Sequence, residues 1–322
     1  MEYLVNASPV AALVGAGAIA PFHIAALRAA GFDLRHIAAR KGSNRALELA
    51  HEWSIPEVWS DPDELISSGR WDAIVLAAST EATPNLLRLA LRTDRPCLVE
   101  KPVSFDPVQI REFLGNDSKL RVAYNRRHYE SAQAARRFAE QGACMFRLEL
   151  PDGVGTDADE LQGLRSVREN SVHGLDLLAC VVGRYRVERV FTLGNPRGRM
   201  AVVTTEFGHV GSIVLNWNCP ANFSLVLDRA PHRFELRPFE LGRLYQGMEV
   251  LEPTPELPVR RYTPKVASEV NSFPGSDGIK PGFLSQANAL KHRVTTGAWD
   301  DGMATIDDAV FAAEVAAALI AG

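Results

Sequence analysis

The chain has no long apolar run, no surplus of basic residues and no leader-like N-terminus, and each absence excludes a class of protein. No apolar stretch approaches the roughly 18 residues that a membrane-spanning helix requires. A formal net charge of −4, with no run of Lys or Arg, predicts no basic surface that could bind nucleic acid. Residues 1–9 lack a basic stretch followed by an apolar run, so no signal peptide is expected. We therefore expect a cytoplasmic protein that binds neither nucleic acid nor a membrane.

Cysteine is scarce as well, and no two cysteines have the C-x-x-C spacing typical of metal or redox sites. They stand far apart in the sequence, at Cys97, Cys144, Cys180 and Cys219. We expect buried or free thiols in a reducing compartment rather than a disulfide framework. No cluster of metal-ligand residue types appears elsewhere, so the sequence predicts no metal site.

A length of 322 residues is enough for roughly two domains of about 150 residues, each with its own core. In the first third, short apolar runs alternate with amphipathic stretches. Uninterrupted apolar strands separated by helices predict a parallel sheet covered on both faces, which is a doubly wound α/β fold. The expected strands are 10–14, 34–39, 58–59, 73–78, 97–100 and 120–123, and the expected helices are 19–30, 44–53, 61–67, 83–92 and 107–114.

The pattern changes after Tyr124, where strand-like segments follow one another with few helices between them. Such a run predicts a mostly antiparallel, open sheet. We therefore expect one domain over residues 1–123 and a second, α/β domain over residues 124–322. The elements expected in the second domain are helices at 129–140, 171–182, 283–294 and 304–320, strands at 144–150, 190–192, 201–207, 212–217 and 223–228, a loop up to Gly163 and a long surface loop over 250–278.

A glycine turn, Gly15-Ala16-Gly17-Ala18-Ile19-Ala20, joins the first expected strand to the first expected helix. In dinucleotide-binding turns the first glycine permits the tight turn, and the second lets the main chain approach the pyrophosphate. A small third residue allows close packing of helix on sheet, and the helix N-terminus adds unpaired N–H groups. The turn predicts a Rossmann domain that binds a dinucleotide through Gly15, Gly17, Ala18 and Ile19. The alternative is a Gly/Ala-rich turn that serves packing alone.

The end of the second expected strand indicates which dinucleotide would bind. NAD sites usually place Asp or Glu there, whereas this chain has Arg40-Lys41-Gly42-Ser43. The nearby acid, Asp33, stands at the start of the strand. Because cationic and hydroxyl groups suit a 2′-phosphate, Arg40 and Ser43 favour NADP, with NAD as the other possibility. Solvated surface charges are the alternative interpretation.

Glu100-Lys101-Pro102 follows the fifth expected strand, at the edge where α/β sheets bind ligands. The proline keeps Lys101 in an extended conformation that can direct its side chain into the crevice. Beside a nicotinamide, a lysine can hydrogen-bond the substrate oxygen and share the proton that moves with the hydride. Spacing alone favours a solvated surface lysine.

His173 and Asp176 lie three residues apart near the start of an expected helix, so they share one face of it. A histidine with an acidic neighbour can act as a general acid or base near neutral pH. Taken alone, the pattern favours a structural histidine beside an aspartate that caps or pairs within the fold.

Taken together, the motifs resemble the glucose–fructose oxidoreductase / inositol dehydrogenase / MocA (Gfo/Idh/MocA) family. The resemblance covers about residues 10–180 and again from about 280 to the last residue. The Glu-Lys-Pro element, at its spacing from the glycine turn, is its most specific part. The matching segments are the glycine turn followed by His23, Ser79-Thr80-Glu81-Ala82-Thr83-Pro84, Glu100-Lys101-Pro102, Tyr124-Asn125-Arg126-Arg127, His173-x-x-Asp176 and Lys280-Pro281-Gly282-Phe283.

The resemblance implies catalytic roles for two residues. Lys101 would contact the reacting hydroxyl or carbonyl group, and His173 would be the acid/base or its close partner. The resemblance also implies that further residues line the cofactor, namely Ser79, Thr80, Pro84, Glu100 and Lys101 itself.

Many members of the family carry an aspartate four residues before the histidine, where this chain has Glu169. Because of that departure no third catalytic residue is predicted, and Asp176 is expected either to support a residue that contacts the substrate or to be a packing residue. The implied substrate-binding residues are Lys101, Asn125, Arg126, Glu169 and His173.

The activity that the resemblance implies is hydride transfer between nicotinamide C4 and a hydroxyl- or keto-bearing carbon. The implied substrates are sugars, sugar nucleotides and cyclic polyols, and the implied assembly is a homodimer or homotetramer formed through the open sheet. Two alternatives stay open: a hydrolase or lyase that keeps NAD bound and oxidises a sugar transiently, and a non-catalytic dinucleotide-binding sensor. A sensor needs no proton donor, so the presence of both Lys101 and His173 argues against it.

Overall fold

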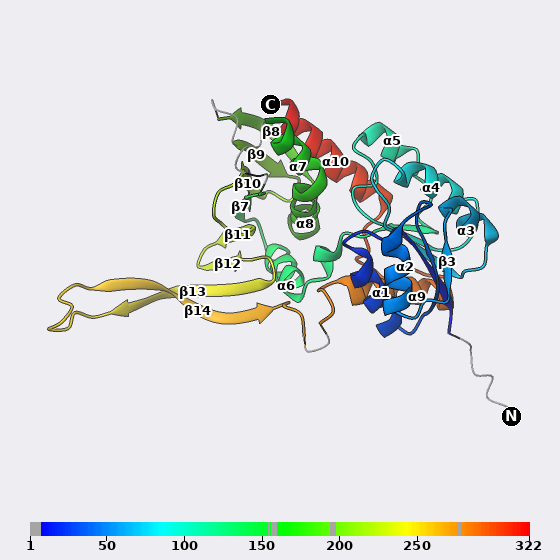
Figure 1. Cartoon of the computed structure of the whole chain (residues 1–322). Coiled ribbons are helices and arrows are strands. Elements are labelled where there is room, and N and C mark those ends of the chain that lie inside the picture. The colour runs from blue at the N-terminus through cyan, green and yellow to red at the C-terminus, as the bar shows by residue number, and fades with distance from the viewer. Residues whose placement is uncertain (1–7, 154, 156–159, 194–197, 276–277) are drawn as a thin grey trace. The chain divides into compact units, whose positions relative to one another are not determined.

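The computed structural model describes residues 8–153, 155, 160–193, 198–275 and 278–322 (Figure 1). Contacts divide the chain into two units. Unit 1 comprises Met1–His128 and Pro274–Glu314, and unit 2 comprises Tyr129–Phe273 and Val315–Gly322. The chain therefore leaves unit 1, returns to it, and enters unit 2 a second time near its end.

Unit 1 is built around a six-stranded sheet with the order β3-β2-β1-β4-β5-β6, in which all neighbours are parallel. The order reverses between β1 and β4, and sheets of this type bind ligands at that point, beyond the carboxyl ends of the strands. The predicted doubly wound sheet is confirmed. Its strands are β1 (Val10–Val14), β2 (Asp33–Ala38), β3 (Glu57–Trp59), β4 (Ala73–Leu76), β5 (Cys97–Val99) and β6 (Leu120–Val122), and its helices include α1 (Ala20–Ala29), α2 (Asn44–Glu52), α3 (Pro62–Ser68), α4 (Thr83–Ala90) and α5 (Pro107–Arg111).

Several helices of unit 1 begin at residues that suit a helix N-terminus. Ser43 Oγ accepts a hydrogen bond from the N–H of Ala46, so Ser43 caps α2. Asp61 and Asp106 cap α3 and α5 in the same way, and a proline follows each of them in the first turn. Local sequence signals therefore agree with the observed helix starts.

A helix from the far end of the chain completes the core of unit 1. α9 (Phe283–Thr296) buries Leu290 in the same apolar cluster as Ile24 of α1 and Leu13 of β1. Residues 274–314 therefore lie in unit 1, whereas the sequence analysis assigned them to the second domain. Helical spacing predicts the helix itself but does not say which unit its apolar face will cover.

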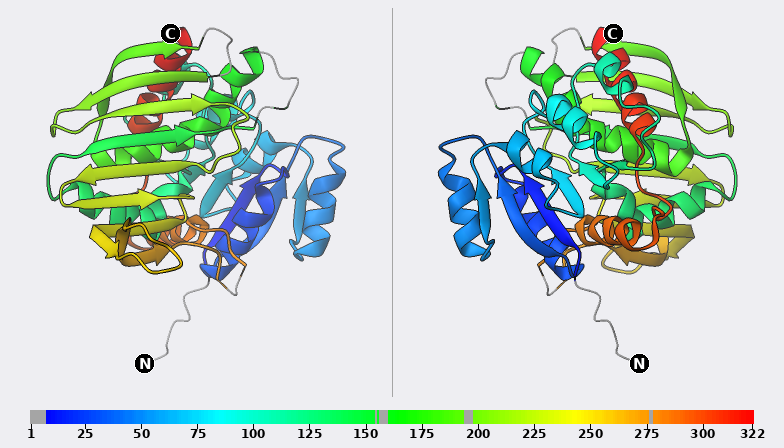
Figure 2. Two further views of the ribbon diagram at one scale, coloured as in Figure 1. Left: turned by 90° about the vertical axis from the view of Figure 1, so that its left-hand side faces the viewer. Right: turned by 90° about the vertical axis from the view of Figure 1, so that its right-hand side faces the viewer.

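Unit 2 contains an eight-stranded sheet with the order β14-β13-β12-β11-β7-β10-β9-β8. All neighbouring strands are antiparallel except β7 and β10, so the predicted mostly antiparallel sheet is confirmed. Figure 2 shows this sheet face-on in its left view. Its strands are β7 (Met145–Leu150), β8 (Tyr185–Thr192), β9 (Gly198–Thr205), β10 (Val210–Asn216), β11 (Ser224–Arg229), β12 (His232–Leu236), β13 (Leu241–Leu251) and β14 (Arg261–Asn271), and helices α6 (Glu130–Ala139) and α8 (Val172–Val182) pack against it.

The middle of this sheet is covered on one face. Phe146 and Leu148 of β7 are buried, whereas Met145 on the opposite face is 66% exposed. Val210, which pairs with Met145, and Met200 are exposed on that same face. The homodimer or homotetramer that the resemblance implies stays a prediction. No helix in the described ranges is long and apolar enough to cross a membrane.

Two segments predicted as loops have regular structure. β14 pairs with β13 in a long hairpin (Figure 1), so the surface loop predicted over 250–278 is wrong at Val250–Leu251 and over Arg261–Asn271. Nearly all of β14 is exposed, so it lacks the apolar alternation of a half-buried strand. The loop predicted up to Gly163 is also wrong at its end, because α7 (Glu160–Ser166) and a π-helical turn (Val167–Ser171) lead directly into α8.

Truncation of Leu290 tests whether α9 is part of the core of unit 1. Leu290→Ala should lower the free energy of unfolding by about 2–5 kcal/mol, because a fully buried side chain leaves a cavity. Leu47→Ala is the matched control, since Leu47 is exposed on α2 and its loss should cost less than about 0.5 kcal/mol. Urea unfolding followed by tryptophan fluorescence measures both, and equal stability of the two variants would contradict this placement of α9.

Candidate active site

A cavity of about 630 Å³ lies in unit 1 beyond the carboxyl ends of β1, β2 and β4. Apart from residues predicted to bind a cofactor, its wall is mostly apolar and includes Pro62 and Leu86. Its position and volume are those expected of a dinucleotide site in a doubly wound sheet. The residues predicted to bind a cofactor that line this cavity are Gly15, Gly17, Ala18, Ile19, Arg40, Ser43 and Ser79.

Gly15 permits the turn that forms one wall of the cavity. Its φ of +112° is a conformation that L side chains rarely adopt, and a Cβ here would stand 2.0 Å from the carbonyl oxygen of Ala77. The N–H of Gly15 also donates to the carbonyl oxygen of Ala38 at 2.8 Å. Only glycine fits so close to the chain that follows β4.

Gly17 faces open space, because a Cβ at this position would meet no atom within 4 Å. Helix α1 begins just beyond it, at Ala20, without a side-chain cap. Within the helix, the N–H of Ala20 donates to Gly17 and that of Phe22 donates to Ile19, and Pro21 has no N–H, so donors to a phosphate would come from the turn that precedes Ala20. Bare main chain beside such donors fits a pyrophosphate, whose oxygens accept hydrogen bonds and carry negative charge.

The end of β2 brings cationic and hydroxyl groups to this cavity. Arg40 is exposed and lines the wall together with Ser43, whose Oγ also caps α2. Asp33 lies at the amino end of β2, away from the cavity. The lining residues include no carboxylate. This side of the cavity therefore suits an anionic group.

Glu100 holds the main chain of the predicted catalytic lysine. One oxygen of its carboxylate, Oε1, lies 2.7 Å from His23 Nε2, and both side chains are largely buried. The other, Oε2, accepts the main-chain N–H of Lys101 at 3.2 Å. The ring of His23 in turn packs edge-on against Phe283 of α9. Sequence reasoning noted His23 only as part of a motif, because the pairing joins residues 77 positions apart.

The other predicted cofactor residues lie outside the lining of this cavity. Thr80 follows β4, and Pro84 is buried in the first turn of α4. Glu100 and Lys101 follow β5, at the same edge of the sheet. Their predicted roles rest on the resemblance to the family.

Asn125 contacts the segment that returns to unit 1. Its Nδ2 donates to the carbonyl oxygen of Pro281 at 3.0 Å. Gly282 approaches the same residue so closely that a Cβ would stand 2.1 Å from the carbonyl oxygen of Asn125. The side-chain amide of Asn125, which is predicted to bind substrate, thus also holds the start of α9 through one of its N–H groups. Its neighbour Arg126, also predicted to bind substrate, is half-buried.

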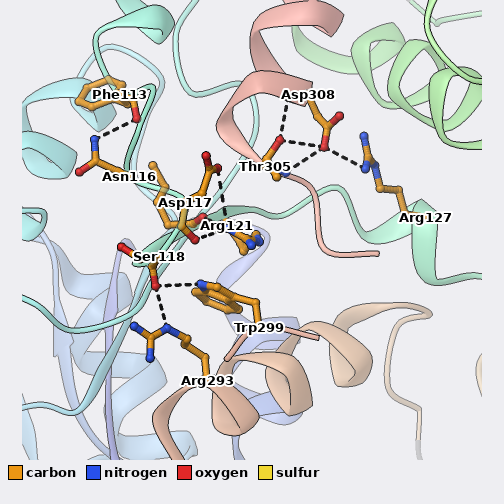
Figure 3. Close-up of polar contacts among 11 residues, drawn as sticks. Phe113, Asn116, Asp117, Ser118, Arg121, Arg127, Arg293, Trp299, Thr305 and Asp308 are labelled. Atoms are coloured by element: carbon orange, nitrogen blue, oxygen red, sulfur yellow. Dashed lines mark hydrogen bonds and ion pairs between the residues drawn. The ribbon is translucent and has the colours of Figure 1, made fainter. Parts of the chain in front are cut away.

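Arg127 forms a buried ion pair in unit 1 with Asp308 at the start of α10 (Ile306–Ala321), with Nη1 and Oδ2 3.1 Å apart (Figure 3). The same Asp308 oxygen accepts the main-chain N–H of Thr305 at 2.9 Å. Burial alone would raise the pKa of the Asp308 carboxyl, but Arg127 and Thr305 hold it below its ordinary value. Arg127 therefore anchors the helix, and Arg126 is the arginine of this motif that stays a candidate for substrate binding.

His173 belongs to unit 2, where it lies in the first turn of α8 and is half-buried. Gly174 lets this turn approach β7, since a Cβ there would stand 2.4 Å from a methyl carbon of Leu150. Asp176 is buried on the same helix, as a packing residue would be. Burial, with help from Asp176, raises the pKa of Tyr185 well above its ordinary value.

Glu169 lies inside the π-helical turn, and its carboxylate pairs with Arg165 at 2.6 Å. Both side chains are substantially exposed. A different carboxylate is buried nearby: Asp152, just past β7, accepts hydrogen bonds from side chains of this helical segment. Sequence reasoning missed Asp152, because a single aspartate in a Gly- and Asp-rich stretch has no pattern that marks it as buried.

Metal ligands are absent from the described residues, in the sense that no three His, Cys, Asp or Glu side chains gather closely enough to hold an ion. The cysteines are free thiols. Complete burial raises the pKa of the Cys97 thiol far above its ordinary value, so this thiol stays protonated.

Residues 10–138 match the model of the GFO_IDH_MocA family, which is described as an oxidoreductase family with an NAD-binding Rossmann fold. The match covers the segment that carries the glycine turn and Glu100-Lys101-Pro102, and it confirms the resemblance to this family.

The chain is similar to myo-inositol 2-dehydrogenase from Thermotoga maritima, with 20% identity over 210 residues. That match covers 62% of this chain and 61% of the relative. Among solved structures, a levoglucosan dehydrogenase in complex with NADH and levoglucosan superimposes with a TM-score of 0.78 at 12% identity, over 98% of this chain and 96% of the other. The UDP-N-acetylglucosamine 3-dehydrogenase from Acidithiobacillus ferrooxidans gives a TM-score of 0.74 at 16% identity, over 98% and 97%. At these identities the structures show that the fold is shared.

The two glycines of the turn should respond differently to an added methyl group. Gly15→Ala should destabilise the protein by about 1–3 kcal/mol, because the new Cβ would overlap the Ala77 carbonyl in a strained conformation. Gly17→Ala should leave stability unchanged and weaken NADPH binding about tenfold, which is about 1.4 kcal/mol, because its methyl group enters the cavity. Thermal unfolding and nicotinamide fluorescence separate the two effects. If Gly17→Ala bound NADPH as tightly as the original chain, the turn would not be the pyrophosphate site.

Proposed function

We propose that this protein is an NAD(P)-dependent oxidoreductase that interconverts a hydroxyl and a keto group on a sugar, a sugar nucleotide or a cyclic polyol. The observation that carries the proposal is the cavity of unit 1, where bare glycine main chain meets an uncapped helix N-terminus at the carboxyl edge of the sheet. When bound, the nicotinamide would donate or accept the hydride.

Lys101 would bind the oxygen of the reacting carbon. Its main chain is held by Glu100, whose carboxylate is itself held by the buried ring of His23. This support restrains the backbone from which the flexible lysine side chain extends. An ammonium donor at the substrate oxygen stabilises the negative charge that develops there as the hydride moves.

His173 would take up the hydroxyl proton during oxidation and return it during reduction. An imidazole changes its protonation state near neutral pH, which suits it to both directions. Its place in the first turn of α8, packed closely on β7 through Gly174, gives the ring a rigid base. Asn125, Arg126 and Glu169 remain candidates for contacts with substrate hydroxyl groups.

The named relatives support the substrate class. Myo-inositol, levoglucosan and UDP-N-acetylglucosamine, which appear in their names, are polyhydroxylated rings or carry one. A shared fold with such enzymes makes a ring with neighbouring hydroxyl groups the first class of substrate to test.

We also propose NADP as the preferred cofactor, because Arg40 and Ser43 line the cavity where NAD sites place a carboxylate. Arg40→Ser should weaken NADPH binding about tenfold and change NADH binding by less than about twofold, because it removes a charge-assisted hydrogen bond to the 2′-phosphate. Arg35→Ser is the control, since Arg35 is exposed on β2 and pairs with Asp33. Fluorescence titrations with both cofactors measure the change. Tighter binding of NADH than of NADPH by the original chain would refute the preference alone.

Replacement of the two catalytic candidates tests the mechanism. Lys101→Met and His173→Ala should each lower kcat about 100-fold or more, as loss of a positioned proton donor or acceptor does. NADPH binding should persist in both. Lys119→Met is the control, because Lys119 pairs with exposed Asp94.

Turnover is followed by the change in nicotinamide absorbance with myo-inositol, levoglucosan and UDP-N-acetylglucosamine as first substrates. Full turnover by either catalytic variant would refute the assigned role. Product formation without a net absorbance change would instead identify a hydrolase or lyase with a tightly bound cofactor.

A further inference from the structure

A buried carboxylate in unit 2 lies next to the helix that carries His173. Asp152 is 2% exposed and is surrounded by donors from one helical segment. Its Oδ2 accepts from Ser166 Oγ at 3.0 Å and from Ser171 Oγ, and its Oδ1 accepts from Asn170 Nδ2. Three side chains of the segment before His173 thus converge on a single acceptor.

The π-helical turn explains how one carboxylate reaches all three donors. In an α-helix, side chains on one face are three or four residues apart, so Ser166 and Ser171 would point in different directions. A π turn has i→i+5 hydrogen bonds and brings residues five apart onto one face. Here Ser166 and Ser171, which are five residues apart, both donate to Oδ2 of Asp152. Single π turns inside helices are rare and occur frequently at functional sites.

Asp152 is itself fixed to the sheet. Its N–H donates to the carbonyl oxygen of Leu150, the last residue of β7, at 3.0 Å. Its carbonyl oxygen accepts the N–H of Asn218, which follows β10, at 2.9 Å. Strands β7 and β10 are neighbours in the middle of the sheet. The side chain of Asp152 therefore attaches the π turn to the middle of the sheet of unit 2.

The position of this turn determines how the next helix begins. His173 follows the π turn by two residues, and the turn inserts one extra residue into the helical path before it. In an uninterrupted α-helix, Glu169 would share a face with His173. In this chain Glu169 instead pairs with Arg165 on an exposed surface, and Asp152 is the carboxylate bound to the segment.

We propose that Asp152 is a positioning residue of the substrate site, whose carboxylate holds the π turn and thereby sets the direction in which α8 presents His173. This inference rests on the proposed role of His173 in catalysis. Asp152 binds neither substrate nor cofactor in this account. Its loss would disturb the placement of the histidine and leave the dinucleotide cavity of unit 1 intact.

The test compares Asp152→Asn with Glu149→Gln in the full chain. Asp152→Asn keeps the size of the side chain but removes its charge and replaces one acceptor oxygen with an amide donor, which weakens the charge-assisted bonds to the π turn. Glu149→Gln is the control, because Glu149 lies on β7, three residues before Asp152, and accepts from Ser224 Oγ, outside the π turn. Histidine side chains labelled with ¹⁵N give resolvable signals, and the signal lost in His173→Gln identifies His173 among the eight histidines.

We expect Asp152→Asn to shift the ring signals of His173 and Glu149→Gln to leave them in place. His209, buried in unit 2 and bonded to the N–H of Cys144, reports whether the unit stays folded. With a substrate that is turned over, kcat should fall about 10- to 100-fold while NADPH affinity is unchanged, as misplacement of a catalytic group does.

Unchanged His173 signals in Asp152→Asn would overturn the inference. If the ring signals of His209 also shift in Asp152→Asn, Ser171→Ala, which removes one donor only, is measured in its place. Unchanged His173 signals in Ser171→Ala would then overturn the inference. These outcomes are independent of the proposed function, which fails if His173→Ala keeps full turnover.

Discussion

The contact between the glycine turn and the chain that follows β4 is the constraint on which the candidate site depends. Gly15 lies against the Ala77 carbonyl, where no side chain fits, and its N–H bonds to Ala38 at the end of β2. The N–H of Ala77 bonds in turn to the carbonyl oxygen of Val14 at 2.7 Å. These contacts join the ends of three strands with main chain alone. The space beyond them stays open, and the walls of the cavity are arranged around this junction.

Each unit also uses a carboxylate with little exposure as an acceptor that holds other groups in place. In unit 1, Glu100 joins His23 of α1 to the main chain of Lys101. In unit 2, Asp152 joins the π turn to the middle of the sheet. A carboxylate accepts several hydrogen bonds at once, and bonds to a charged acceptor are stronger than neutral ones. Both carboxylates are therefore suited to fix a flexible segment beside a residue proposed to take part in catalysis.

Much of unit 1 could be predicted from the sequence, because its strands are buried on both faces and read as uninterrupted apolar runs. The glycine turn could also be predicted from the sequence, because its close contacts admit only glycine at position 15 and so leave a recognisable motif. β14 escaped prediction because main-chain pairing with β13, rather than burial, accounts for its structure. The hydrogen-bond partners of His23 and Asp152 could not be predicted for another reason. They depend on tertiary packing, which brings together residues that have no characteristic spacing in the sequence.

The discontinuity of unit 1 has a consequence for how the protein is made. A ribosome releases residues 1–128 first, then all of 129–273, and only afterwards the helix that carries Leu290. That helix fills part of the core around β1 and α1, so the nascent dinucleotide-binding half emerges with an uncovered apolar groove. Domains fold as they emerge during translation, and exposed apolar surface invites aggregation and chaperone capture. The part of the chain that is synthesised first is thus completed only after the intervening sheet of unit 2 has left the ribosome.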